Sequence, residues 1–448
     1  MNLDKALLLT NLFYVIFILY IVRYSQKNRI GILGSIILIF MITPYNILIN
    51  RVGNTNEIQL FNSVYRLKIL GLSIADFIML GFGCYLVIFK RSQLKKAISS
   101  MKIMKIIFIR DILYICLGSV SFFLTRGYFL DGGRTYLITI RSFLFCWITY
   151  FIVRSIEMKK KKINFLKIFQ FLIIGSFILS FFFRREDVWI RFGNKIMLLS
   201  QEWGLYYSIY LLIYFVLKLI NKVTIKKLLI SIFLIYILLN DFYKTNIVQI
   251  LYFIIFLTLF CNKNRIIKYI KNIIYVISVV VILVISIINL KETQAIETRF
   301  QQWNEYTSYI SKSDEKIYRV LFGSGIGSPY EGKMGDFGES KSIDREKFGK
   351  YKFAIQTPYI SNFKEVGIVG IIGLFIINGY LSFKLLVNNK RLKRENMIEY
   401  RFIIYVITYN LLTFSVFNTS PPLAIFFGVI YARYNKYNRN IFFKKGEK

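Results

Sequence analysis

Nine basic residues could bind phosphate groups if the loops and helix ends that carry them meet at one surface. They are Arg126, Arg134, Arg141, Arg184, Arg185, Arg191, Lys195, Lys244 and Arg299. A guanidinium binds two phosphate oxygens with a planar pair of N–H groups, whereas the lysine ammonium acts as a point charge. Each residue alone could equally be a solvated loop charge. Together they predict a basic basin that suits a pyrophosphate head group anchored by a lipid tail.

The composition excludes several kinds of catalytic site. The chain contains no histidine, and its four cysteines lie in or beside apolar stretches without paired spacing. Ser-His-Asp and Cys-His catalysis are therefore excluded, and we expect no metal site, disulfide framework or cofactor. The run Gly323-Ser324-Gly325-Ile326-Gly327 lacks the lysine and the strand-then-helix context of a nucleotide loop, so it predicts only a turn.

Charged residues also lie inside apolar stretches, where they are costly and are by default candidates for function. Arg141 and Glu202 lie near the outer ends of their stretches, and Asp76 lies deeper. For Asp76 a structural and a functional role are equally compatible with the sequence. For the adjacent Arg110 and Asp111 we expect local pairing and side chains that extend toward the membrane surface.

The elements that must position these residues are membrane-spanning helices. Of 448 residues, 56% are hydrophobic and 18% aromatic, more than a soluble chain of this length needs to fill a core. Apolar stretches that suit spans occur at 6–22, 30–49, 68–89, 106–124, 136–153, 165–183, 196–217, 228–243, 247–262, 272–290, 362–388, 402–418 and 422–433. We predict an all-α fold, a polytopic transmembrane helix bundle of about 12–13 spans with one large extracytoplasmic loop lobe.

The orientation follows from the basic residues in the linkers. Clusters of Lys and Arg recur at alternate linkers: 23–29, 90–105, 154–162, 218–227, 263–268, 390–394 and the tail 433–448. We expect these linkers in the cytoplasm, which places the C-terminus inside and the N-terminus outside. The formal charge of +36 is scattered over linkers rather than gathered on one folded face, so nucleic acid is not expected as a partner.

One polar segment, residues 291–361, divides the chain into three parts. It separates N-terminal transmembrane helices (1–290) from C-terminal transmembrane helices and a cytoplasmic tail (362–448). The segment has eleven Lys or Arg and ten Asp or Glu, so it is nearly neutral in a basic chain. The orientation places it outside the membrane, and we expect the chemistry of the protein there.

The polar segment begins with an amphipathic pattern over 297–311. Phe300, Trp303, Thr307 and Ile310 fall roughly on one face of a helix. Such a pattern predicts a helix that lies against the membrane surface.

Six short motifs follow one another from Arg191 to Gly373. They are Arg191 at the start of a span, Lys244 in a tight hairpin, Thr298-Arg299 followed by Trp303, the run Leu321–Gly327, Tyr359-Ile360, and the run Glu365–Gly370. Their order and spacing around one large outward loop resemble the bacterial O-antigen polymerase and O-antigen ligase superfamily of lipid-linked polysaccharide enzymes. Two positions depart from that pattern: Gln356-Thr357 stands where ligases usually have His-Asn, and Lys244 stands where the hairpin usually has Arg.

The resemblance implies a metal-independent polymerase that joins undecaprenyl-pyrophosphate-linked oligosaccharide repeats on the outer face of the bacterial cytoplasmic membrane. Arg191, Arg299 and Arg141 would stabilise the pyrophosphate leaving group. Glu202 or Glu365 would accept the proton of the sugar hydroxyl, although Glu365 could instead cap its helix. The expected substrate-binding residues are Lys244, Arg184, Arg185, Trp303, Gly325, Gln356 and Tyr359. The implied partners are the lipid-linked oligosaccharide, membrane lipids and a chain-length regulator protein.

Two other functions remain open at this point. A ligase that transfers finished polymer to an acceptor differs from the polymerase only by the missing histidine. A lipid-linked oligosaccharide flippase would have a similar number of spans, but alternating access predicts short loops on both faces, and the long polar segment argues against it.

Overall fold

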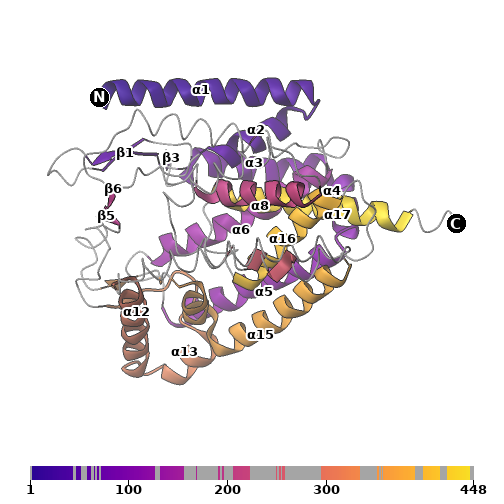
Figure 1. Ribbon diagram of the computed structural model, residues 1–448. Helices are drawn as coiled ribbons and strands as arrows, with labels where there is room; N and C mark the ends of the chain where they lie inside the picture. The colour runs from indigo at the N-terminus through magenta and orange to yellow at the C-terminus, as the bar shows by residue number, and fades with distance from the viewer. Residues whose placement is uncertain are drawn as a thin grey trace.

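The computed structural model describes only part of the chain, and its elements are labelled in Figure 1. The described residues are 3–43, 47–51, 58–61, 65, 68–69, 72–126, 132–155, 168, 190–191, 194–195, 205–221, 249, 252–253, 255–257, 294–332, 351–352, 355, 357–388, 397–413 and 421–443. The predicted spans 165–183, 228–243, 247–262 and 272–290 lie wholly or largely outside them.

Helices make up most of the described chain, in agreement with the predicted fold class. They are α1 (Leu3–Lys27), α2 (Ile32–Ile42), α3 (Ile74–Phe89), α4 (Arg91–Ser99), α5 (Ile103–Leu124), α6 (Gly132–Ser155), α8 (Leu205–Asn221), α12 (Gln294–Ser311), α13 (Lys316–Phe322), α15 (Pro358–Asn388), α16 (Met397–Thr413) and α17 (Pro421–Phe443). All fall on predicted spans except α4, which lies in a basic linker, and α12 and α13, which lie in the polar segment. Helix α17 starts at the proline pair, as proline at a first helical position predicts.

Short strands depart from the all-helical prediction. Among the described residues four antiparallel pairs form: β1 (Ile47–Arg51) with β2 (Ile58–Phe61), β3 (Lys68–Ile69) with β4 (Leu72–Ser73), β5 (Ile190–Arg191) with β6 (Asn194–Lys195), and β7 (Tyr330–Glu331) with β8 (Tyr351–Lys352). As a result α2 ends and α3 begins inside the apolar stretches 30–49 and 68–89. In the sequence Pro44 comes two residues after the end of α2, and proline disfavours a helical conformation of the residue before it, Thr43.

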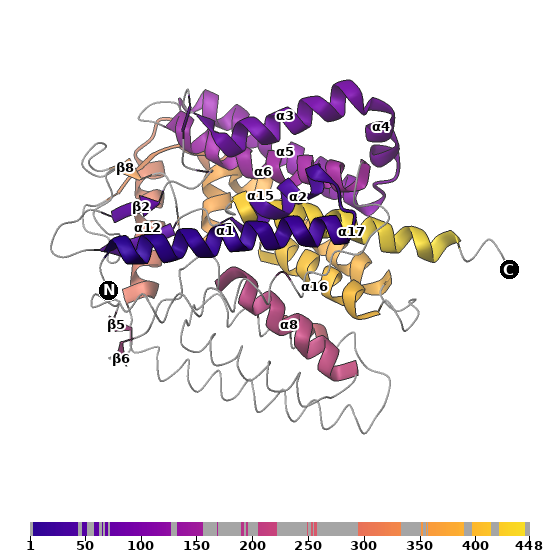
Figure 2. The same cartoon turned by 90° about the horizontal axis from the view of Figure 1, so that it is seen from above.

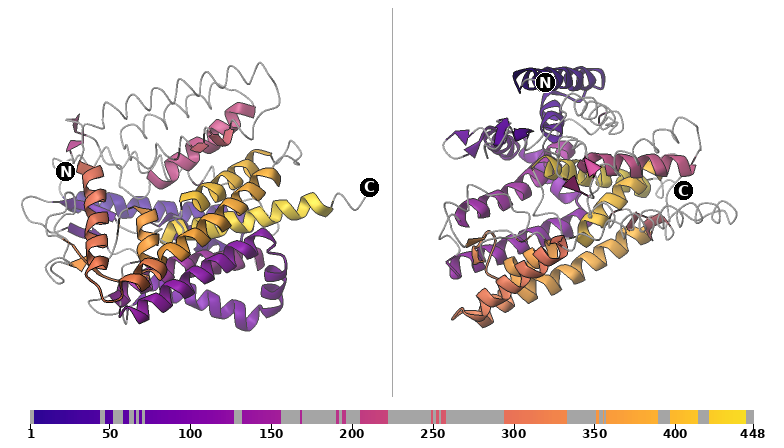
Figure 3. Two further views of the ribbon diagram at one scale, coloured as in Figure 1. Left: turned by 90° about the horizontal axis from the view of Figure 1, so that it is seen from below. Right: turned by 60° about the vertical axis from the view of Figure 1, so that its left-hand side comes forward.

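The helices form a bundle with the two termini at opposite ends (Figure 1). Helices α5 and α15 pack side by side, and α6 packs against α17. Seen from above, α1 runs along the direction of α17, with α3 on one side and α8 on the other (Figure 2). Helix α12 stands at one end, across the direction of α16 and α17 (Figure 3, left). A Cβ at Gly428 would press on the Cys146 carbonyl, so glycine permits the close approach of α17 to α6.

A buried ion pair lies inside this bundle. Arg110 donates from Nε to Asp111 Oδ1 at 2.8 Å and from Nη1 to Asn378 Oδ1 at 2.7 Å. Trp147 Nε1 donates to Asp111 Oδ2 at 3.0 Å. The predicted pairing is confirmed, but the expected extension toward the membrane surface is wrong, because groups from α6 and α15 satisfy both charges in the interior.

Two of the described helices are long and apolar enough to cross a membrane, α5 over Ile103–Leu124 and α15 over Pro358–Val387. Helix α15 is not continuous, because Gly367 adopts a non-helical conformation within it. This kink divides a short N-terminal part from the apolar part that follows.

Candidate functional site

The candidate site lies where the polar segment meets the ends of α5 and α15. Helix α12 leads into α13, and α13 ends at Gly323, the first residue of the turn Gly323–Gly327, which we call the glycine turn. Gly323, Gly325 and Gly327 all have positive φ, at 84°, 96° and 73°. Residues with a Cβ rarely adopt this backbone region, so the predicted turn is confirmed with a physical reason for its glycines.

The glycine turn contacts the kink of α15 backbone to backbone. Gly367 has φ 63°, and a Cβ on it would lie 2.5 Å from the backbone nitrogen of Gly323. A Cβ on Gly323 would lie 2.6 Å from the carbonyl carbon of Glu365. Real Cβ contacts essentially never fall under 3.0 Å, so both positions require glycine. Two motifs that are far apart in the sequence therefore form one joint.

Hydrogen bonds connect the glycine turn to both neighbouring helices. Ser324 N donates to the Lys364 carbonyl at 2.7 Å, and Ile326 N donates to the Gly118 carbonyl at 3.1 Å. Thr125 Oγ1 donates to the Ser324 carbonyl at 2.6 Å. The turn consequently links α5 to α15 and fixes the end of α13 between them.

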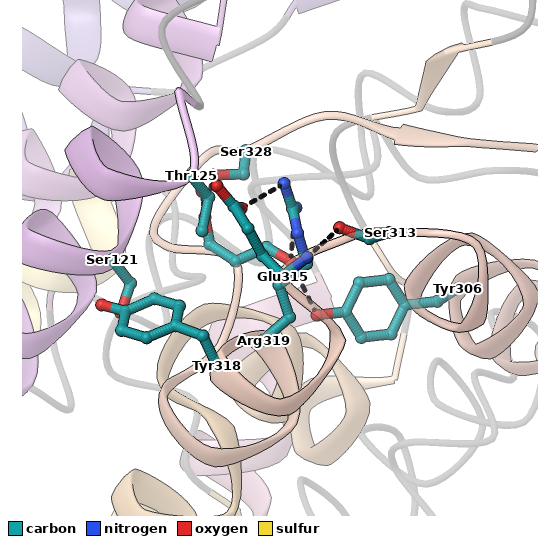
Figure 4. A network of polar contacts seen from close by, with 9 residues as sticks. Ser121, Thr125, Tyr306, Ser313, Glu315, Tyr318, Arg319 and Ser328 are labelled. Carbon is teal, nitrogen blue, oxygen red and sulfur yellow. Dashed lines mark hydrogen bonds and ion pairs between the residues drawn. The ribbon is translucent and has the colours of Figure 1, made fainter.

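A buried arginine, Arg319, contacts the glycine turn from α13 (Figure 4). Its Nη2 donates to Glu315 Oε2 at 3.0 Å, and its Nη1 donates to Ser324 Oγ at 3.3 Å. The Tyr306 hydroxyl lies 3.1 Å from the same Ser324 oxygen. Burial raises the pKa of Tyr306, so the phenol stays protonated at neutral pH. Arg319 was not among the predicted site residues, although the i, i+4 spacing from Glu315 signals such a pair.

Lys364 is a second buried cation at the joint. Its ammonium donates to the Ser328 carbonyl at 2.8 Å and lies 5.9 Å from the centre of the Tyr330 ring. The sequence analysis did not select it either. Its position inside the predicted span 362–388, where a charge is costly, was the available signal.

Glu365 is buried, with 4% of its surface exposed, and accepts hydrogen bonds from two sides. Tyr114 of α5 donates its hydroxyl to Glu365, and Ser361 Oγ donates to Glu365 Oε1 at 3.4 Å. Glu365 does not cap the helix that starts after Gly367, because its carboxylate accepts from the Tyr114 and Ser361 hydroxyl groups and not from a backbone N–H of that helix. These contacts fasten α15 to α5.

Four predicted site residues lie on α12, the glycine turn and α15, the elements that lead to this joint. Arg299 is half-buried on α12, and its Nε has no hydrogen-bond partner among the described residues. Trp303 lies one turn further, with its ring centre 5.5 Å from that of Phe363 on α15. A Cβ on Gly325 would press on the backbone of Phe122. Tyr359 donates to the Leu412 carbonyl of α16 at 2.8 Å.

Arg141 belongs to a different place, the contact between α3 and α6. Its Nη1 lies 3.4 Å from Asp76 Oδ2. Asp76 is not deep in a span: it forms a capping box with Ser73 at the start of α3, where Ser73 N donates to Asp76 Oδ2 at 2.8 Å. An acidic residue in a first turn stabilises the helix, so Asp76 has a structural role and compensates the charge of Arg141.

The remaining predicted site residues are not placed. Of Arg191 the structure describes the backbone in β5. Arg184, Arg185, Glu202, Lys244 and Gln356 lie outside the described residues.

The face of α12 that was expected on the membrane meets protein instead. Tyr306 and Ile310 are buried in a cluster with Tyr330, and Trp303 contacts Phe363. Phe300 alone of the predicted face is 65% exposed. The prediction of a helix is confirmed, and its assignment to the membrane surface is wrong.

Within the described part of the chain, no group of three or more His, Cys, Asp or Glu residues could hold a metal ion. The arrangement instead offers cations and hydroxyl groups around a rigid turn. Comparisons of the chain with protein-family models, with curated proteins and with solved structures gave no match.

Proposed function

We propose that the chain is a multi-pass enzyme of the bacterial cytoplasmic membrane that polymerises undecaprenyl-pyrophosphate-linked oligosaccharide repeats on the outer face. The observation that carries this proposal is the joint between the glycine turn and the kink at Gly367. The runs Leu321–Gly327 and Glu365–Gly370 belong to the motif order that resembles the polymerase and ligase superfamily. Their direct backbone contact gives that order a structural reason.

The exposed side chains of α15 support a position in the bilayer. The exposed large apolar residues of α15 after Gly367, which we call the apolar stripe, are Ile368, Val369, Ile372, Phe375, Ile376, Tyr380, Phe383 and Val387. They occupy roughly 140° of the helix circumference over about 30 Å, the thickness of the hydrocarbon core. In the most apolar 18-residue stretch of α15, only 33% of the residues are buried inside the protein. Soluble monomers rarely expose an apolar patch of this size. Before Gly367, Tyr359 is the one large apolar residue of α15 that is exposed, so we place the joint at the outer boundary of the membrane.

We extend this position to a bundle of about 12–13 spans, with the N-terminus outside and the C-terminus in the cytoplasm. In support, the N-terminus and α12 lie at one end of the molecule and the C-terminus at the other (Figure 1).

In the proposed reaction, a sugar hydroxyl of one lipid-linked unit attacks the anomeric carbon of the growing glycan. The bond from that carbon to the pyrophosphate oxygen breaks, and the hydroxyl proton passes to a base. Arg299 and Arg191 stabilise the charge that develops on the pyrophosphate, without a metal ion or cofactor. Glu202 remains the candidate base, since Glu365 is buried against Tyr114 and Ser361.

The surface polysaccharide of a strain that lacks this chain tests the proposal. We expect single repeat units on the surface in place of long polymer, because repeats reach the outer face but are not joined. Long polymer that is not attached to its acceptor would instead indicate a ligase. Accumulation of the lipid-linked unit in the cytoplasmic leaflet would indicate a flippase. Electrophoresis of extracted polysaccharide and a leaflet assay for the lipid-linked unit separate the three outcomes.

A further inference from the structure

Helix α13 has an exposed apolar face. Ile317 is 76% exposed and Leu321 is 39% exposed, and residues four positions apart lie on one face of a helix. Arg319 lies on the opposite side of the helix, where it is buried against Ser324. The short helix therefore has Arg319 toward the protein and an uncovered apolar face, beside which Lys316 is also exposed.

The exposed face of α13 continues the apolar stripe of α15. Leu321 contacts the kink directly, since a Cβ on Gly367 would press on the Leu321 carbonyl. The stripe begins at the next residue, Ile368. Figure 1 places α13 at the end of α15, along the same edge of the molecule. One apolar surface thus passes from α15 around the kink onto α13.

We infer that α13 is an interfacial helix, with its Ile317–Leu321 face in the outer leaflet, between the lipid head groups and the acyl chains. The inference rests on the membrane position given under the proposed function. Interfacial helices bury an apolar face by about 5–10 Å at this boundary. A protein partner is disfavoured because the surface is continuous with the stripe, whose length fits the hydrocarbon core.

This position has a consequence for the site. The glycine turn directly follows α13, so contact of α13 with lipid sets the depth of the turn in the membrane. Arg319 and Ser324 then lie near the level of the lipid phosphates, on the protein side of α13. A lipid-anchored pyrophosphate could reach the site by lateral diffusion along the apolar surface.

Fluorescence quenching in proteoliposomes tests the inference. Single cysteines at Ile317, Phe383 and Asn304, in a chain with the four native cysteines replaced by alanine, would carry an environment-sensitive fluorophore. All three positions are exposed, so labelling does not disturb the core. We expect lipids with a head-group nitroxide to reduce the emission at position 317 at least about twofold. Lipids with a nitroxide deep in the acyl chain should quench position 383, and aqueous iodide should quench position 304.

The controls separate failure of the inference from failure of the proposed function. If iodide alone quenches position 317 while deep nitroxide quenches position 383, the interfacial role of α13 is overturned and the membrane position stands. If no lipid nitroxide quenches position 383, the membrane position itself fails, and the proposed function with it. Disulfide cross-linking of position 317 between two copies of the chain would show that a second copy covers the face, which also overturns the inference.

Discussion

Gly325→Ala should abolish polymer formation and destabilise the protein by about 3 kcal/mol or more, because the new Cβ has no space and the backbone conformation is strained. Gly325 has φ 96°, and its Cβ would press on the backbone nitrogen and Cα of Phe122 in α5. Backbone atoms inside a helix cannot move aside as a flexible side chain can. The turn must therefore shift, and its hydrogen bonds to α5 and α15 are lost.

Gly373→Ala is the matched control for this substitution. Gly373 lies on α15, and a Cβ there would meet nothing within 4 Å. Alanine also favours a helix over glycine by up to about 1 kcal/mol. Thermal unfolding in detergent and polymer length in complemented cells measure both effects. Equal stability and equal polymer for Gly325→Ala and Gly373→Ala would show that the joint is not required.

Arg299→Ala should reduce polymer formation at least about 100-fold, the usual effect of removing one group that stabilises developing negative charge. Arg299 is half-buried on α12, and its buried Nε has no hydrogen-bond partner in the part of the chain that the structure describes. Arg299→Lys should also be impaired, because a point charge does not replace a planar fork that binds two oxygens.

Lys312→Ala is the matched control for Arg299→Ala, since it removes an exposed cation from the same polar segment. It should retain normal polymer length. Immunoblots of membrane fractions establish that each variant is inserted at the normal level, and electrophoresis of the polysaccharide gives the polymer length. Normal polymer in Arg299→Ala would remove this residue from the site.

Local patterns in the sequence predicted local features correctly. The 3.6-residue periodicity located α12, the proline pair located the start of α17, and the glycines located the turn after α13. These signals depend on backbone conformation and on neighbours along the chain, which a sequence contains directly.

Features that depend on distant partners were not predictable in the same way. The expected surface position of Arg110 and Asp111 was wrong, because Asn378 and Trp147 reach them from other helices. Asp76, 65 positions from Arg141, provides a counter-charge for this arginine that the local sequence did not predict. The face of α12 was misassigned for a similar reason, because the Tyr330 and Phe363 rings that cover it lie far along the chain.

The proposed polymerase is tested most directly in a purified system. The protein is mixed with lipid-linked repeat units in excess EDTA, and the length of the products is measured. We expect a ladder of lipid-linked polymers to form at close to the rate without chelator, since arginines rather than a metal ion stabilise the pyrophosphate. Activity that disappears in EDTA and returns with magnesium would contradict the metal-independent mechanism. If the repeat units remain single under all three conditions, without EDTA, with EDTA and with added magnesium, this chain is not a polymerase.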